Sequence, residues 1–161
     1  MATITFKGLE EYERRLSNLG KKADEIAGKA VYAGAAIVAD EVRRRLKRNL
    51  DDPEYLGYKT DNTSKNEHSK NGKHKGNSGG LYDSLGISSM QTKDGYINVK
   101  IGFDGYDSNG VPNQLKARVM ESGTSKQKKR PFVRPALYAS QSRAVAKMSE
   151  VIDEEIEKIM K

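Results

Sequence analysis

The amino-acid sequence predicts an α+β fold in which two long helices cover a small antiparallel sheet. Apolar residues recur every three or four positions, as on one face of a helix, over residues 21–49 and 135–160. Between these stretches, residues 97–103 alternate between apolar and other side chains, as in a strand with one buried face. A chain of 161 residues fits one domain, so we expect residues 1–161 to form a single unit.

The chain begins with a predicted strand and a first helix. Residues 3–6, Thr-Ile-Thr-Phe, alternate as a short strand does. The apolar residues that follow recur at helical spacing, and they are Leu9, Tyr12, Leu16 and Leu19. Gly20 comes directly after them, and glycine commonly ends a helix. We therefore expect the first helix to end at Gly20 and a second to begin at Lys21.

The second helix, at residues 21–49, has two apolar faces of different length. One face runs along the whole helix and contains Ala27, Val31, Ala35, Val38, Val42 and Leu46. The other face occupies only the first half and contains Ile26, Ala30, Ala33 and Ile37. Charged residues continue that second face, namely Asp40, Glu41, Arg44 and Arg48. We expect the first half to be enclosed on two sides, with close approach at small residues such as Gly34, and the C-terminal end to emerge from the protein.

A polar insertion at about residues 51–80 separates this helix from the rest of the domain. Residues 59–80 contain no apolar side chain that could bury surface and offset the entropy of ordering. We therefore expect a mobile loop. Compact domains rarely contain such a long loop without a use for it, so we expect the loop to order against a partner.

The sheet is predicted to be a hairpin. Leu85, Ile87 and Met90 indicate one strand, residues 97–103 indicate the returning strand, and Lys93-Asp94-Gly95 is a typical hairpin turn. After a polar loop at residues 105–112, residues 115–120 fit a short helix and a strand equally well.

The last helix is predicted at about residues 135–160. Its apolar seam consists of Val145, Met148, Ile152, Ile156 and Ile159. Its outer face is acidic and contains Asp153, Glu154, Glu155 and Glu157.

The segment before this helix, which we call the connector (residues 123–135), combines glycine, proline and basic residues in a specific order. Gly123 can adopt the positive φ that most residues avoid. Pro131 and Pro135 favour extended or first-turn geometry on either side of Phe132, which we expect in the core of its own subunit. The candidate assembly residues are Gly123, Thr124, Ser125, Lys126, Arg130, Pro131, Phe132, Arg134 and Pro135.

Basic residues outnumber acidic ones by 29 to 22, which gives a formal net charge of +7. Much of the excess lies at residues 43–48 and 126–130, and the candidate basic patch contains Arg43, Arg44, Arg48, Lys128 and Lys129. Such clusters bind nucleic acid, an acidic partner or only water. The chain has no cysteine, which excludes disulfides and thiolate metal sites. No apolar window approaches membrane-spanning length, so we expect no membrane contact.

The sequence offers little for catalysis. Its two histidines, His68 and His74, both lie in the polar insertion, where no rigid element would hold a metal or fix a hydrogen-bond partner. A phosphate-binding loop, a dinucleotide-binding glycine motif, a nucleophile elbow and a histidine-paired nucleophile are all missing from the sequence. We therefore expect no enzymatic activity, no metal site and no cofactor.

The order of these elements resembles a known family. The resemblance is carried by Lys7-Gly-Leu9 before an amphipathic helix, the alanine-rich helix, Gly79-Gly-Leu-Tyr-Asp-Ser-Leu85 opening a hairpin, Gly123-Thr-Ser-Lys126, and Arg130-Pro-Phe-Val-Arg-Pro-Ala-Leu137 before the last helix. The set is similar to the head-tail joining or tail-completion proteins, the minor tail and neck proteins, of long-tailed bacteriophages and prophages.

This resemblance implies a non-enzymatic structural subunit of virion assembly. The subunit would form a homo-oligomeric ring, for example a hexamer, at the tail end or neck, where it would complete the tail and join it to the head. Its partners would be its own copies, tail-tube proteins and head-connector proteins, in the virion and, during assembly, in the host cytoplasm. Arg130 or Arg134 would meet a carboxylate of the adjacent subunit. The alternative is a small basic nucleic-acid-binding protein.

Overall fold

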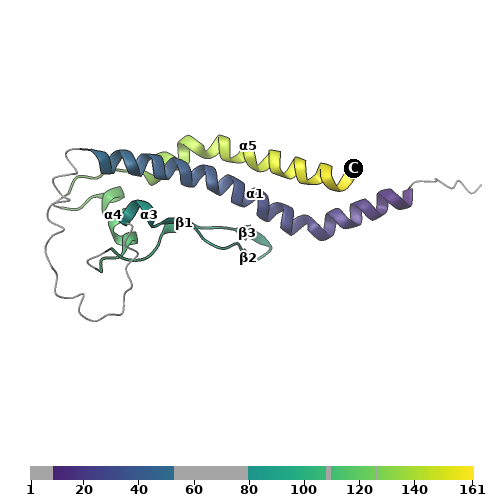
Figure 1. The fold of residues 1–161 in the computed structure, drawn as a ribbon, viewed down its shortest axis with the longest axis horizontal. Coiled ribbons are helices and arrows are strands. Elements are labelled where there is room, and N and C mark those ends of the chain that lie inside the picture. The colour runs from purple at the N-terminus through teal and green to yellow at the C-terminus, as the bar shows by residue number, and fades with distance from the viewer. Residues whose placement is uncertain (1–8, 53–79, 108–109, 126) are drawn as a thin grey trace, which may run out of the picture.

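The computed structural model describes residues 9–52, 80–107, 110–125 and 127–161, and it confirms an α+β fold (Figure 1). The elements follow one another as α1 (Leu9–Asp51), α3 (Gly80–Asp83), β1 (Leu85–Ile87), β2 (Gln91–Lys93), β3 (Tyr96–Asn98), β4 (Ile101–Phe103), α4 (Asn113–Ser122) and α5 (Val133–Met160). The strand predicted at residues 3–6 and nearly all of the polar insertion lie outside the described residues.

Helix α1 is continuous over 43 residues, so the prediction of a helix end at Gly20 is wrong. Glycine inside a helix costs only about 1 kcal/mol relative to alanine, and it keeps the backbone N–H that proline lacks. That cost does not break a helix in which Leu19, Lys21, Lys22 and Ala23 beside the glycine favour the helical state. The N-terminal, purple part of α1 is inclined to the rest of the helix in Figure 1.

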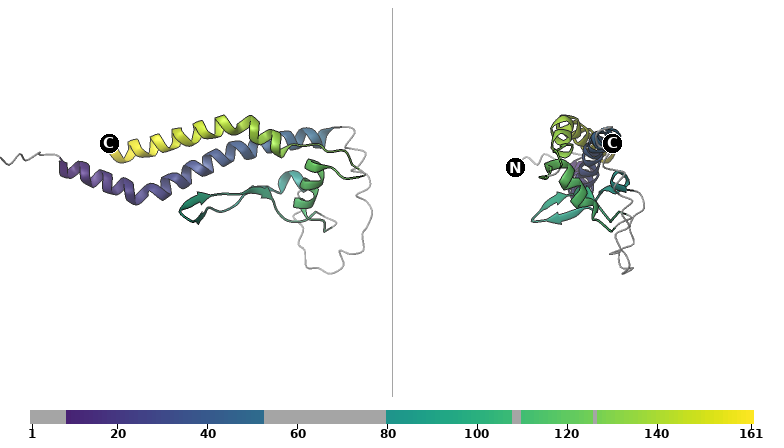
Figure 2. Two further views of the ribbon diagram at one scale, coloured as in Figure 1. Left: turned by 180° about the vertical axis from the view of Figure 1, so that it is seen from behind. Right: turned by 90° about the vertical axis from the view of Figure 1, so that its left-hand side faces the viewer.

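The middle of α1 lies between α5 on one side and the strands on the other (Figures 1 and 2). Gly28 faces the strands, because a Cβ built there would lie 2.5 Å from the Sδ of Met90. Gly34 faces α5, where a Cβ would overlap the side chain of Met148. These contacts confirm both the two-sided enclosure and the close approach at Gly34.

The C-terminal half of α1 emerges only in part: Asp40, Arg44 and Arg48 are exposed as predicted, but the helix stays against the core. It carries Val42 and Leu46 into the main core, which is completed by Leu81, Leu85, Phe103, Ala117, Met120, Phe132 and Ala136. Glu41, assigned to the emerging face, is only 5% exposed. The prediction failed because arginines of α1 and α5 surround this carboxylate, so a charged residue is accommodated inside the fold. The part of α1 that extends outward is its N-terminal end (Figure 2).

The predicted hairpin is confirmed, with one interruption. β1 pairs antiparallel with β4, with Leu85 opposite Phe103, and β2 pairs with β3, with Lys93 opposite Tyr96. Asp94 and Gly95 form the turn with φ values of 53° and 78°, as a two-residue hairpin turn requires. Between the two pairs of strands, the backbone N–H of Ser88 donates to the Lys100 carbonyl over 2.8 Å.

Two remaining elements are settled by the structure. Residues 115–120 belong to α4 and are therefore helical. In α5 the fully buried positions are Ala136, Ser140 and Ala144, whereas Val145 is 55% exposed and does not belong to the seam as predicted. The apolar pattern was misleading because this half of α5 meets α1 through small side chains. The other predicted seam residues are half-buried, namely Met148, Ile152, Ile156 and Ile159.

Candidate functional site

The connector begins with a turn that only glycine allows at its first position. Gly123 ends α4 with φ of 76° and ψ of 179°, and its N–H donates to the Val119 carbonyl over 2.8 Å. A Cβ at this position would lie 2.8 Å from the backbone nitrogen of Lys129 and 2.9 Å from the carbonyl oxygen of Gln127. The predicted positive φ is therefore confirmed, and the connector folds back tightly on Gly123.

The next residues close a short loop. The Thr124 N–H donates to the Gln127 carbonyl over 2.9 Å, and the Gln127 N–H donates to the Thr124 Oγ1 over 3.0 Å. Ser125 and Lys128 are exposed on this loop. Lys126 lies outside the described residues.

Phe132 anchors the end of the connector in the core. Its side chain is fully buried, and its ring meets that of Phe103 edge-on, with centroids 5.9 Å apart and planes at 72°. Two residues before Phe132, the Arg130 N–H donates to the Met120 carbonyl over 2.7 Å. This hydrogen bond ties the connector to α4. The expectation that Phe132 packs within its own subunit is confirmed. Pro135 occupies the first turn of α5, where a missing N–H is tolerated.

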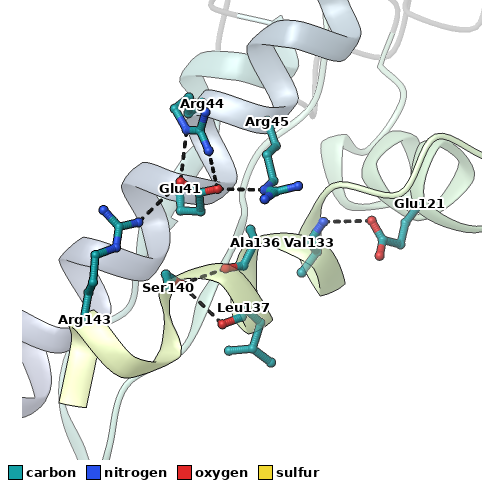
Figure 3. A network of polar contacts seen from close by, with 9 residues as sticks. All are labelled: Glu41, Arg44, Arg45, Glu121, Val133, Ala136, Leu137, Ser140 and Arg143. Atoms are coloured by element: carbon teal, nitrogen blue, oxygen red, sulfur yellow. Dashed lines mark hydrogen bonds and ion pairs between the residues drawn. The ribbon is translucent and has the colours of Figure 1, made fainter. Parts of the chain in front are cut away.

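A carboxylate from α4 caps the N-terminus of α5. Glu121 Oε2 accepts hydrogen bonds from the N–H groups of Val133 (Figure 3) and Phe132 over 2.9 and 2.7 Å. Its Oε1 accepts one from Arg134 N–H over 3.1 Å. Burial favours the neutral form of Glu121, but these three backbone donors outweigh it and lower its pKa below the ordinary value. The cap was missed from the sequence because it reaches across the whole connector.

The connector is also tied to the end of α1. Arg130 Nη1 lies 2.5 Å from Asp52 Oδ2, and the Asn49 Nδ2 donates to the Arg130 carbonyl over 2.9 Å. Arg130 thus has a carboxylate partner within its own chain, whereas Arg134 is exposed. These contacts bring the two basic clusters of the sequence to the same end of the molecule.

Only part of the predicted basic patch is available to a partner. Arg43 pairs with Asp40 over 3.1 Å and Arg44 with Glu41 over 2.6 Å. The other three residues, Arg48, Lys128 and Lys129, are exposed. An open hollow of about 570 Å³ lies at this end, and its lining mixes both charges: Arg44, Lys47, Arg48, Asp51 and Asp52.

Glu41 connects α1 to α5 through a cluster of arginines (Figure 3). Its carboxylate lies 2.6 Å from Arg44 Nη2, 2.7 Å from Arg45 Nε and 3.5 Å from Arg143 Nη2. The hydrogen bond from Arg44 is the largest influence, and with that from Arg45 it overcomes the effect of burial and lowers the pKa of Glu41 to about 2. Sequence periodicity placed Glu41 on a solvated face because its α5 partner is distant in sequence.

Comparison with known proteins identifies the family. Residues 10–105, more than half of the chain, match the model of the HK97-gp10-like family, described as "Bacteriophage HK97-gp10, putative tail-component". The chain belongs to this family. Searches of curated proteins and of solved structures gave no match.

The HK97-gp10-like match covers α1 through β4 and ends before α4. It therefore includes Glu41 and the arginines of α1, and it leaves out the connector and α5. Membership makes this protein a phage tail component, in agreement with the resemblance read from the sequence. The role of the connector residues in assembly stays a prediction.

The described part of this HK97-gp10-like protein shows no group of three or more His, Cys, Asp or Glu residues able to hold a metal ion. His68 and His74 both lie outside that part. Among the described helices, none is long and apolar enough to span a membrane.

Proposed function

We propose that this protein is a non-enzymatic structural subunit that forms a ring at the tail end or neck, completes the tail and joins it to the head. The observation that carries the proposal is the match to a phage tail-component family over residues 10–105. The ring would contain copies of this chain, for example six, and would contact tail-tube and head-connector proteins in the virion after assembly in the host cytoplasm.

The shape of the subunit supports packing against neighbours. α1 and α5 form a long antiparallel pair, and the main core occupies only the end of that pair near α3 and α4 (Figure 1). Large apolar side chains remain exposed toward both ends of the pair, including Tyr12, Leu16, Leu137 and Tyr138. Exposed apolar surface of this kind marks contacts with other proteins.

The connector would contribute polar contacts to the assembly. Gly123, Pro131, Phe132 and Pro135 shape its backbone, and Arg130 fastens it to α1. The exposed side chains of Ser125, Lys128, Lys129 and Arg134 would face an acidic surface of a neighbour.

The test is to co-express the chain with the tail-tube and head-connector proteins of the same phage genome. Electron microscopy should show rings of this protein capping tail tubes, and omitting the protein should leave tubes that do not join heads. A chain that remains monomeric at high concentration, and does not attach to tubes, would contradict the proposal.

The convergence of basic residues at one end favours a second candidate, direct contact with nucleic acid. Arg48, Lys128 and Lys129 are exposed close to the α1–connector junction. Replacing all three with alanine should then weaken DNA binding. The plot of the logarithm of the DNA association constant against the logarithm of the salt concentration should become less steep by about 3, because three phosphate contacts are lost. A monomer that retards DNA at physiological salt would favour this candidate over the ring.

A further inference from the structure

The N-terminal part of α1, which we call the arm (residues 9–25), carries an apolar stripe that its own subunit leaves largely uncovered. Tyr12 is 52% exposed and Leu16 is 45% exposed, and Leu19 continues the stripe one turn further. Arg15 donates to the carbonyl of Met160, the last residue of α5. The end of α5 therefore lies beside Arg15 of the arm, and the part of the arm before Arg15 extends past that end (Figure 1).

The first half of α5 carries a second uncovered apolar surface, which we call the outer face. It consists of Val133, Leu137, Tyr138 and Val145, which are 38%, 50%, 77% and 55% exposed. At 3.6 residues per turn, these residues lie within an arc of about 140° around the helix axis. At 1.5 Å per residue the outer face is about 18 Å long, and the stripe from Tyr12 to Leu19 is about 10 Å long, so the stripe fits within the face.

A subunit cannot cover its own outer face with its own arm. The arm lies at the C-terminal end of α5, whereas the outer face ends at Val145, about 22 Å away along the helix from Met160. The two surfaces thus lie toward opposite ends of one rigid helix pair. Such an arrangement suits a head-to-tail contact between copies, which forms a closed ring when the rotation between subunits allows.

The charges around the two surfaces are complementary. The first turns of the arm are acidic and carry Glu10, Glu11 and Glu13, all exposed, before the basic residues Arg14 and Arg15 follow; Glu11 pairs with Arg15. On the outer face the charge is basic, because Arg134 is exposed between Leu137 and Tyr138; farther along α5, Arg143 pairs with Glu41 and Lys147 with Glu150. Opposite charges beside matched apolar surfaces favour one orientation of docking and disfavour the contact of a surface with its own copy.

We propose that the arm of one subunit packs on the outer face of α5 of the next subunit, with Tyr12 and Tyr138 at the centre of the contact. The proposal rests on ring formation, and it specifies which surfaces form the ring. Buried tyrosines commonly dominate the affinity of such contacts.

Matched substitutions test the two surfaces in the full-length chain. Tyr12→Asp and Tyr138→Asp should each raise the dissociation constant of self-association by about 10-fold or more, measured by analytical ultracentrifugation under conditions in which the wild type assembles. Tyr96→Asp is the control, because Tyr96 is as exposed as Tyr138, at 77%, but lies in β3 outside both surfaces. It should assemble like the wild type, and all three variants should keep the helical content of the wild type.

Mixing the two variants gives the decisive result. The Tyr12→Asp chain keeps an intact outer face and the Tyr138→Asp chain keeps an intact arm, so the mixture should form a heterodimer that cannot grow further. Rings that persist in both variants would overturn this interface and leave the proposed function standing. Homodimers of either variant would also overturn this interface. So would a Tyr138→Asp chain that forms normal rings but no longer binds tail tubes. A wild type that forms no ring, even with its tail proteins, would overturn the proposed function itself.

Discussion

Glu121 holds two helices together from a single side chain. It belongs to the last turns of α4, yet its carboxylate accepts three backbone N–H groups at the start of α5. The N-terminus of a helix carries partial positive charge and unpaired donors, so a carboxylate there satisfies both. Phe132, the first of these donors, enters the core at the same point.

Replacing Glu121 tests this cap. Glu121→Ala should lower the free energy of unfolding by about 1–2 kcal/mol, because all three donors lose their acceptor. Glu121→Gln keeps an acceptor oxygen but loses the charge, so it should cost less. Urea denaturation followed by circular dichroism measures both, and Glu154→Gln on the exposed side of α5 is the control. Equal stability of the alanine variant and the control would contradict the assignment.

Gly123 and Gly95 allow two causes of strain to be separated. Their φ values are 76° and 78°, but a Cβ at Gly95 meets nothing within 4 Å, whereas at Gly123 it meets the backbone of Gln127 and Lys129. Gly95→Ala should therefore cost about 1 kcal/mol for the left-handed backbone alone. Gly123→Ala should cost clearly more, since its ψ of 179° belongs to a region that is open essentially only to glycine, and the connector must also open. Thermal unfolding of the two variants would refute the steric argument if it gave the same loss.

At the scale of elements, the helix pair α1–α5 depends on a glycine in contact with a methionine. A Cβ on Gly34 would overlap Met148, while a Cβ on Gly20, in the same helix, meets nothing within 4 Å. The same substitution should thus have opposite effects at the two positions.

Gly20→Ala should stabilise the protein by up to about 1 kcal/mol through helix propensity. Gly34→Ala should destabilise it by about 1 kcal/mol or more, because overpacking exceeds that gain. In a Met148→Ala background, Gly34→Ala should become neutral or stabilising, which a double-mutant cycle measures. A destabilisation by Gly34→Ala that does not depend on Met148 would contradict this packing.

Elements that depend on local sequence were predicted well. The turn at Asp94-Gly95 and the backbone of Gly123 follow from residue type, and the long helices follow from periodicity. Elements that depend on distant partners were not predictable. Glu41 is buried beside α5, where Arg143 joins the two nearer partners of its own helix, Arg44 and Arg45. Helix α1 continues through Gly20 because the cost of one glycine is too small to end it. In the candidate site, the shape of the connector was predicted, but its contacts with Asp52 and Glu121 were not.

At the scale of the whole molecule, paired carboxylates make folding depend on pH. In the folded protein the pKa of Glu41 is lowered from its ordinary value of 4.5 to about 2, first through the hydrogen bond from Arg44, and the pKa of Glu121 is lowered as well. A folded-state pKa below the unfolded one adds stability that is complete above about pH 4.5. That stability is lost as the pH falls toward 2, because the unfolded chain then binds protons more readily.

The midpoint of thermal unfolding should therefore fall steeply between about pH 4.5 and pH 2. Glu41→Gln should be less stable than the wild type at pH 7, and its stability should change less over this range. Differential scanning calorimetry at a series of pH values measures both effects, with Glu154→Gln as a control that keeps the wild-type profile. A Glu41→Gln variant with the full wild-type pH dependence would show that this carboxylate is not responsible.

The contact between Gly34 and Met148 also has a chemical consequence. This chain has no cysteine, so its sulfur chemistry lies in its methionines. Conversion of a thioether to a sulfoxide adds a polar oxygen and alters the shape of the side chain. Met148 is half-buried against a position where even one added carbon does not fit. Oxidants that reach this sulfur would therefore loosen the two long helices from each other.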